Sequence, residues 1–138
     1  MTVGPRVSWA VPGVVGAITV WLAVAAPVGA AGSDEMGRAI GEMMTAAQAM
    51  VDSGERRDSK RLVSEAGRVM EAGERVLAAL PRPGNRHARD SAEHVRGAMD
   101  HARLVVEAAH RGQDNDALTH ARRALRQVRQ GAGHAEAL

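Results

Sequence analysis

The segment "HVRGAMDHARLVVEAAHRGQDNDALTHARRAL" (residues 94–125) carries the pattern that decides the fold. Its apolar residues recur at steps of three and four on both sides of a turn signal, in which Gly112 is followed by Asp114 and Asn115. Such steps place side chains on one face of an α-helix, and glycine commonly follows a helix whereas aspartate or asparagine commonly begins one. The segment therefore predicts two antiparallel helices joined by a short turn.

The same helical periodicity covers the rest of the chain after its first thirty residues. It is interrupted at "DSGERRD" and at the proline-rich "PRPGN", and no strand-like alternation competes with it. The expected helices span roughly residues 33–51, 58–80, 85–111 and 114–130. Short connections make consecutive helices antiparallel neighbours, so we expect an all-α protein whose residues 31–138 form one antiparallel up-down-up-down four-helix bundle.

The first thirty residues have a different composition from the rest of the chain. Arg6 is followed by an apolar run that ends at Ala26, and Val28 and Ala30 then fit the −3 and −1 positions of a signal-peptidase site. This order is typical of a secretory signal peptide, so we expect residues 1–30 to be removed and the protein to be periplasmic or secreted, without stable insertion in a membrane. A retained transmembrane anchor is the alternative, because about 20 apolar residues span a bilayer.

The composition excludes several classes of protein. Trp9 and Trp21 lie in the leader and the chain has no Phe, Tyr or Cys, so the core must consist of aliphatic residues and methionine. Removing Arg6 leaves 17 of the 18 basic residues against 16 acidic ones. A nearly balanced chain without aromatic side chains is not expected to bind nucleic acid. It has no glycine-rich phosphate loop, cysteine nucleophile or serine elbow, so we do not expect an enzyme.

The histidines are unevenly distributed. Five of the six lie between residues 85 and 120, the sixth is His134, and the first two expected helices have none. His87, His94 and His101 follow one another at seven-residue intervals, which is two helical turns, so they should form one stripe. Neighbours in this stripe lie about 10.5 Å apart along the helix axis. They cannot share one metal ion, because metal–nitrogen bonds are about 2 Å long.

Other residues could complete a metal site with this stripe. Asp90 lies on the same face and could pair with either His87 or His94. If both hairpin turns are short, Glu74 and His134 are roughly level with His94 and could form a site from three helices. Which of these arrangements occurs depends on how each helix is rotated about its axis.

Two histidines lie apart from the stripe. His110 is near the end of its helix, close in sequence to Asp114 and Asp116, and these three residues form a second candidate site. His120 lies on the last expected helix and needs a partner from a neighbouring helix. For every histidine the alternative is a solvated position on a helix surface that binds nothing.

The two halves of the expected bundle resemble each other as a diverged repeat. "AIGEMMTAAQAM" in the first expected helix aligns with "AMDHARLVVEAAH" in the third, and "VSEAGRVM" in the second aligns with "LTHARRAL" in the fourth. In this alignment Glu42 falls opposite His101 and Glu65 falls opposite His120. Each of these positions exchanges one side chain that can bind a metal for another.

The segments "HVRGAMDHAR" (94–103) and "DALTHARRAL" (116–125) resemble the repeat of the small metal-binding protein family. That family's repeat contains an "AxxHA" element, present here as "AMDHA" (98–102) and "ALTHA" (117–121). The resemblance implies a periplasmic histidine-rich four-helix bundle that binds divalent metal, particularly copper, weakly and at several sites. This chain departs from the family in having fewer histidines and none in its first hairpin.

We therefore expect an exported protein that binds divalent transition metal ions weakly through helix-borne histidines and carboxylates, for buffering or scavenging. Copper(II) is the first candidate because it heads the affinity order for nitrogen and oxygen ligands, with nickel(II) and zinc(II) as alternatives. Binding should weaken as the pH falls through about 6.5, where histidine becomes protonated. The methionines recur at helical spacing, which favours core positions over ligation of monovalent copper.

Two other functions are compatible with the pattern. A helical interaction or chaperone-like protein of the cell envelope would act through the arginine-rich "RRALRQVRQ" (122–130) and a methionine-lined core edge. No sequence feature identifies its protein partner. A heme-binding bundle would use one histidine and one methionine as axial ligands, but the chain lacks a CxxCH attachment motif.

Overall fold

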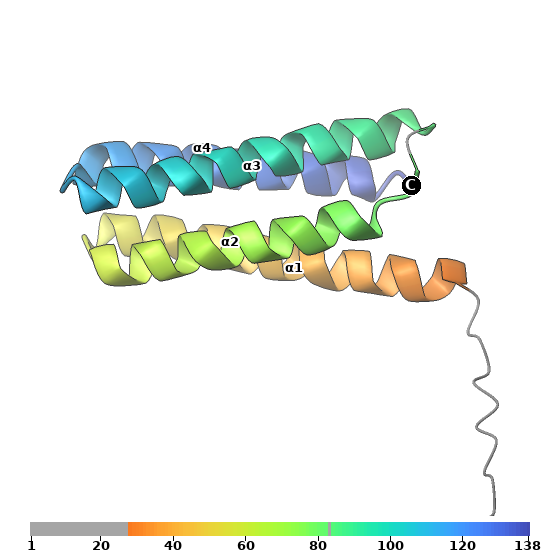
Figure 1. Ribbon diagram of the computed structural model, residues 1–138, viewed down its shortest axis with the longest axis horizontal. Coiled ribbons are helices and arrows are strands. Elements are labelled where there is room, and N and C mark those ends of the chain that lie inside the picture. Colours follow the sequence, from red (N-terminus) through yellow and green to blue (C-terminus); the bar gives the residue numbers. More distant parts are fainter. Residues whose placement is uncertain (1–27, 83) are drawn as a thin grey trace, which may run out of the picture.

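The computed structural model describes residues 28–82 and 84–138, which form a bundle of four helices (Figure 1). The helices are α1 (Val28–Glu55), α2 (Ser59–Ala79), α3 (Arg86–His110) and α4 (Asp114–Ala135). Each helix packs against its neighbours in the sequence, and α4 also packs against α1, so the helices follow one another around the bundle. This arrangement confirms the predicted all-α, up-down-up-down four-helix bundle.

The predicted signal peptide falls almost entirely within residues 1–27, which lie outside the described residues. Helix α1 begins at Val28, so the expected cleavage after Ala30 would fall within its first turn. No helix among the described residues is long and apolar enough to cross a membrane.

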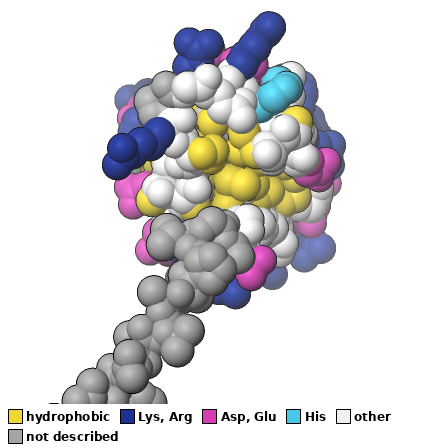
Figure 2. All heavy atoms as spheres, turned by 90° about the vertical axis from the view of Figure 1, so that its right-hand side faces the viewer, with side chains coloured by type: hydrophobic (Ala, Val, Ile, Leu, Met, Phe, Trp, Pro, Cys, Tyr) yellow, Lys and Arg dark blue, Asp and Glu magenta, His cyan; other side chains and the backbone are white. Residues whose placement is uncertain are grey.

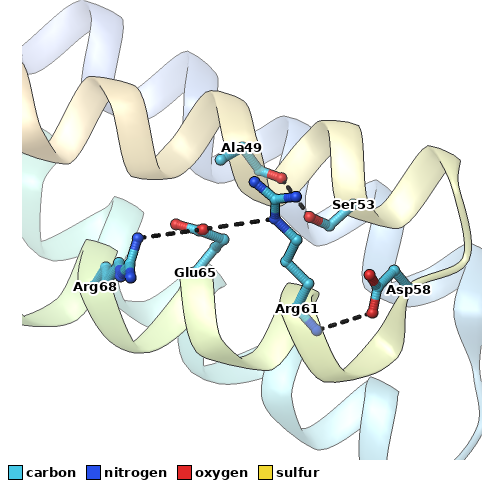
Figure 3. Close-up of polar contacts among 6 residues, drawn as sticks. All are labelled: Ala49, Ser53, Asp58, Arg61, Glu65 and Arg68. Carbon is cyan, nitrogen blue, oxygen red and sulfur yellow. Dashed lines mark hydrogen bonds and ion pairs between the residues drawn. The ribbon is translucent and has the colours of Figure 1, made fainter.

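Helices α1 and α4 extend further than predicted, because contacts with other helices override the local turn signals. Helix α1 continues into "DSGERRD", where the buried Ser53 hydroxyl donates a hydrogen bond of 2.7 Å to the Ala49 carbonyl (Figure 3). The next residue, Gly54, packs against Leu118 of α4. Helix α4 likewise continues past the glycines near its end, because Gly131 is buried against α3.

The turns between helices are fixed by local hydrogen bonds. The side chains of Asp58 and Asn85 cap α2 and α3 by accepting hydrogen bonds from backbone N–H groups of the first turn. At the other end of α3, Gly112 has a φ of 70°, in the left-handed region that favours glycine. The Gln113 N–H then donates a hydrogen bond of 2.9 Å to the Ala108 carbonyl, as in a Schellman motif. This turn sets the register of α3 against α4.

The core consists of alanine, valine, leucine and methionine, as predicted from the lack of aromatic residues. Met43 and Met50 are among its largest fully buried side chains. Gly73 of α2 faces Met99 of α3, and a Cβ at position 73 would lie 2.7 Å from the Met99 Cγ and Sδ atoms. Viewed along the bundle, apolar side chains occupy the centre and charged side chains surround them (Figure 2). The small core residues thus let the helices approach closely.

Candidate functional site

The histidine stripe of α3 faces α4, which carries a second stripe at the same seven-residue spacing, formed by His120, Gln127 and His134. Seven residues is nearly two helical turns, so each stripe stays on the side of its helix that faces the other. Because the helices are antiparallel, His101 lies opposite His120, and His94 lies opposite Gln127. The structure therefore supplies the partner that His120 lacked in the sequence.

The first group of rings, here called the imidazole pair, consists of His101 and His120. The two ring centroids lie 5.5 Å apart, and the two Nδ1 atoms are 3.3 Å apart, which is within hydrogen-bonding distance. A neutral imidazole has one N–H and one acceptor nitrogen, so only one of these Nδ1 atoms carries a proton. Both side chains are partly exposed, so solvent reaches the pair.

The surroundings of the imidazole pair favour the neutral form of His101. Burial lowers the pKa of His101, and positive charge on His120, Arg123 and Arg126 lowers it further, while the carboxylate of Asp100 opposes the shift. Neutral imidazole is the form that binds metals. The lowered pKa favours this neutral form of His101 at neutral pH.

The second group, here called the imidazole trio, consists of His87, His94 and His134. The centroid of the His134 ring lies 5.9 Å from that of His87 and 5.4 Å from that of His94. The His94 and His134 rings are nearly parallel, with an interplanar angle of 8°. His94 also places its Nδ1 atom 2.7 Å from Oε1 of Gln127. His134 thus contacts two α3 histidines that are two turns apart.

The backbones of α3 and α4 approach closely beside the imidazole trio. The buried Ser91 hydroxyl donates a hydrogen bond of 2.9 Å to the Gly131 carbonyl. A Cβ at Gly131 would lie in van der Waals contact, 3.4 Å from both the His94 Cβ and the Ser91 carbonyl oxygen. The two helices thus approach each other directly beside His94.

The two carboxylates predicted to join the stripe have different surroundings. Asp90 forms an ion pair with Arg86, with 3.7 Å between Oδ2 and Nε. Glu74 is exposed on α2 and lines a shallow hollow with Glu71 and Arg75, because α2 turns its apolar face to the core. Among the residues whose side chains are described, no group of three or more histidines and carboxylates is arranged to hold a metal ion. The predicted three-helix site of Glu74, His94 and His134 is therefore not preformed, whereas the pairing of Asp90 with His87 or His94 stays a prediction.

The three residues of the candidate site at the turn after α3 line two different hollows. His110 is exposed and lines a hollow with Ser59 and Lys60 of α2. Asp114 and Asp116 line a separate hollow with Arg57 and residues of the turn. The end of α3 and the first turn of α4 thus present these side chains to different surroundings.

The groove between α1 and α2, here called the arginine–glutamate groove, lies in the first hairpin where the histidines between α3 and α4 lie in the second. Glu42 and Glu65, which the repeat aligns with the imidazole pair, both line this groove of about 600 Å³. Arg75 forms an ion pair with Glu42, and its hydrogen bond lowers the pKa of that carboxyl. Glu65 is 7% exposed and lies 3.5 Å from Arg68 and 3.9 Å from Arg61 (Figure 3). Both glutamates of this groove are therefore paired with arginines.

One polar residue of the site was not predicted from the sequence. Gln127 lies seven residues after His120 and seven before His134, so the same spacing that identified the α3 stripe would have indicated it. Comparison with known proteins adds no ligand assignment, since no family model, curated protein or solved structure matches this chain. The candidate site rests on its own geometry.

Proposed function

We propose that the protein is exported and binds divalent transition metal ions through the histidines between α3 and α4, for buffering or scavenging outside the cytoplasm. The observation that supports this most directly is the 3.3 Å separation of the His101 and His120 Nδ1 atoms. Two nitrogens that each lie about 2.0–2.1 Å from one metal ion are about 3.3 Å apart at a tetrahedral angle and about 2.9 Å apart at the right angle that copper(II) prefers. Small rotations of the two rings would therefore let one ion bind both.

The number of nitrogen ligands indicates weak binding, because the protein fills only part of the coordination shell of a metal ion. The imidazole pair supplies two nitrogens, so water or another small ligand must fill the remaining positions around an ion. Imidazole nitrogen suits copper, nickel and zinc, and copper(II) heads the affinity order. Partial exposure of both rings gives an ion a direct path from solvent. Export is supported by the leader-like composition of residues 1–30.

Isothermal titration of the protein with copper(II) or nickel(II) at pH 7.5 tests the proposal. We expect a dissociation constant below about 100 μM, which corresponds to more than about 5 kcal/mol of binding free energy. Replacing both His101 and His120 by glutamine should remove one class of sites. The matched control replaces Glu42 and Glu65 by glutamine at the counterpart positions and should change nothing. Absence of binding tighter than about 100 μM by the wild type would reject the proposal.

A further inference from the structure

Gln127 occupies the middle of the α4 stripe, and its side chain reaches α3. Its Oε1 atom lies 2.7 Å from Nδ1 of His94. An amide oxygen only accepts hydrogen bonds, so the His94 Nδ1 must be the donor. Neutral His94 then carries its proton on Nδ1 and has a free lone pair on Nε2.

The packing of α3 against α4 supports this hydrogen bond. A Cβ at Gly97 would lie 3.3 Å from both Cδ and Oε1 of Gln127, so the absence of a side chain at position 97 makes room for the amide. The hydrogen bond of 2.9 Å from Ser91 to Gly131 joins the helices one turn away along each of them. The contact between His94 and Gln127 is therefore part of the helix interface.

We propose that Gln127 is a positioning residue for a divalent transition metal ion. It fixes His94 as the Nδ1–H tautomer, so that His94 binds the ion through Nε2. His134, whose ring lies nearly parallel to that of His94, rotates to direct one of its nitrogens at the same ion. This inference rests on the proposed function and adds the ligating nitrogen and the residue that selects it. Metal-binding histidines usually donate their second ring N–H to an oxygen, which orients the ring and makes the ligating nitrogen more basic.

The imidazole pair provides the contrast. Its two Nδ1 atoms face each other, and among the described contacts of these rings no oxygen accepts from either Nδ1. The proton between them can reside on His101 or on His120, so neither tautomer is fixed. A metal ion that bound both Nδ1 atoms would replace this shared proton, whereas an ion on His94 would leave the hydrogen bond to Gln127 intact.

The tautomer can be read without metal. Long-range ¹H–¹⁵N NMR spectra of the ¹⁵N-labelled full chain at pH 7.5 should show the His94 proton on Nδ1. Gln127→Leu removes the acceptor and should shift His94 toward the Nε2–H tautomer. Gln130→Leu is the matched control, because Gln130 is exposed one turn further along α4, and it should leave the His94 signals unchanged.

Copper(II) titration then tests the consequence for binding. In a background with His101→Gln and His120→Gln, only the imidazole trio and His110 remain. There, Gln127→Leu should weaken the tightest copper binding by about 10–100-fold, the usual cost of losing such a partner. Gln127→Glu keeps an oxygen acceptor and should restore the affinity. Equal urea midpoints for the variants would show that folding is not the cause.

The outcomes separate the two proposals. A proton on Nε2 of His94 in the wild type, or unchanged copper affinity in Gln127→Leu, would overturn this inference even if the protein binds copper. Failure of the wild type to bind copper or nickel would overturn the proposed function and, with it, the role of Gln127 toward a metal. The NMR result would still decide whether Gln127 fixes the tautomer.

Discussion

The α1–α2 and α3–α4 hairpins share their antiparallel geometry and their apolar inner faces, but their outer surfaces differ in chemistry. Between α1 and α2, Glu42 pairs with Arg75, and the nearly buried Glu65 lies beside Arg61 and Arg68. Between α3 and α4, the corresponding side chains are imidazoles that contact other imidazoles and an amide. One hairpin thus carries carboxylates paired with arginines, and the other carries imidazoles that contact one another and an amide.

The neighbours of these side chains differ between the two hairpins as much as the side chains themselves do. A carboxylate that already accepts a hydrogen bond from a guanidinium must lose that partner before it can bind an ion. A partly exposed neutral imidazole need only exchange a hydrogen bond for a metal bond. The positions that the predicted repeat aligns therefore differ in chemistry between the two hairpins.

The largest effect should come from removing the α3 stripe. Replacing His87, His94 and His101 by glutamine takes one or more rings from every histidine contact, so copper affinity should fall at least about 100-fold, or about 2.7 kcal/mol. Calorimetry measures the loss, and circular dichroism should show the same helix content. If the Glu42→Gln, Glu65→Gln control loses copper binding instead, the ligands lie in the arginine–glutamate groove.

The two hairpins meet at Gly73, where a smaller but substantial effect is expected. Gly73→Ala places a Cβ against Met99, and this overpacking should destabilise the protein by about 1–3 kcal/mol. Gly67→Ala, on the same helix but with open space around it, should stabilise by about 0.5–1 kcal/mol. Urea unfolding compares the two variants. Equal stabilisation by both would mean that Met99 does not fix the spacing between hairpins.

The two hairpins should change the stability of the protein in different pH ranges, and the α3–α4 hairpin should do so through His101. Burial is the first cause of the lowered pKa of His101, with smaller contributions from His120, Arg123 and Arg126 against Asp100. The folded state then binds protons less readily than the unfolded state, whose histidine pKa is about 6.5. The free energy of unfolding should therefore be fully retained above pH about 6.5. It should fall as the pH drops from there toward the lowered pKa of His101.

One substitution tests whether the imidazole pair causes this loss of stability at low pH. His120→Gln removes a positive neighbour, so the pKa of His101 should rise toward its usual value and the decline in stability below pH about 6.5 should become shallower. Histidine NMR titrations and urea unfolding at several pH values measure both quantities. An unchanged His101 titration in His120→Gln would mean that the rings do not interact electrostatically.

The smallest effect belongs to the arginine–glutamate groove. The hydrogen bond from Arg75 is the main cause of the lowered pKa of Glu42. The contribution of this exposed pair to folding stability is therefore present above the unfolded pKa of 4.5. It is lost as the pH falls through the lowered pKa of the folded state. Arg75→Gln should raise the Glu42 pKa toward 4.5, with little change in stability at pH 7. Carboxyl NMR titration reads this directly. A Glu42 pKa that stays lowered would assign the shift to Arg38 instead.

Much of the fold could be predicted from the sequence, because the signals that determine it are local. Prolines end α2, and the turn after α3 needs Gly112 in a left-handed conformation. Such local signals placed five of the eight helix boundaries within one residue of their expected positions. The end of α1 could not be predicted, since "DSGERRD" contains turn-forming residues. Burial of Ser53 and the contact between Gly54 and Leu118 keep those residues helical.

The sequence by itself determined an all-α bundle with an aliphatic and methionine core, and a histidine stripe along its third helix. Periodicity and composition suffice for these properties, because each is set within a single helix or by the absence of a residue type. Only the tertiary structure decided what the stripe faces. It paired His101 with His120, brought Gln127 to His94, and left Glu74 exposed on α2. These contacts depend on the rotation and register of neighbouring helices, which small residues such as Gly131 set across the interface.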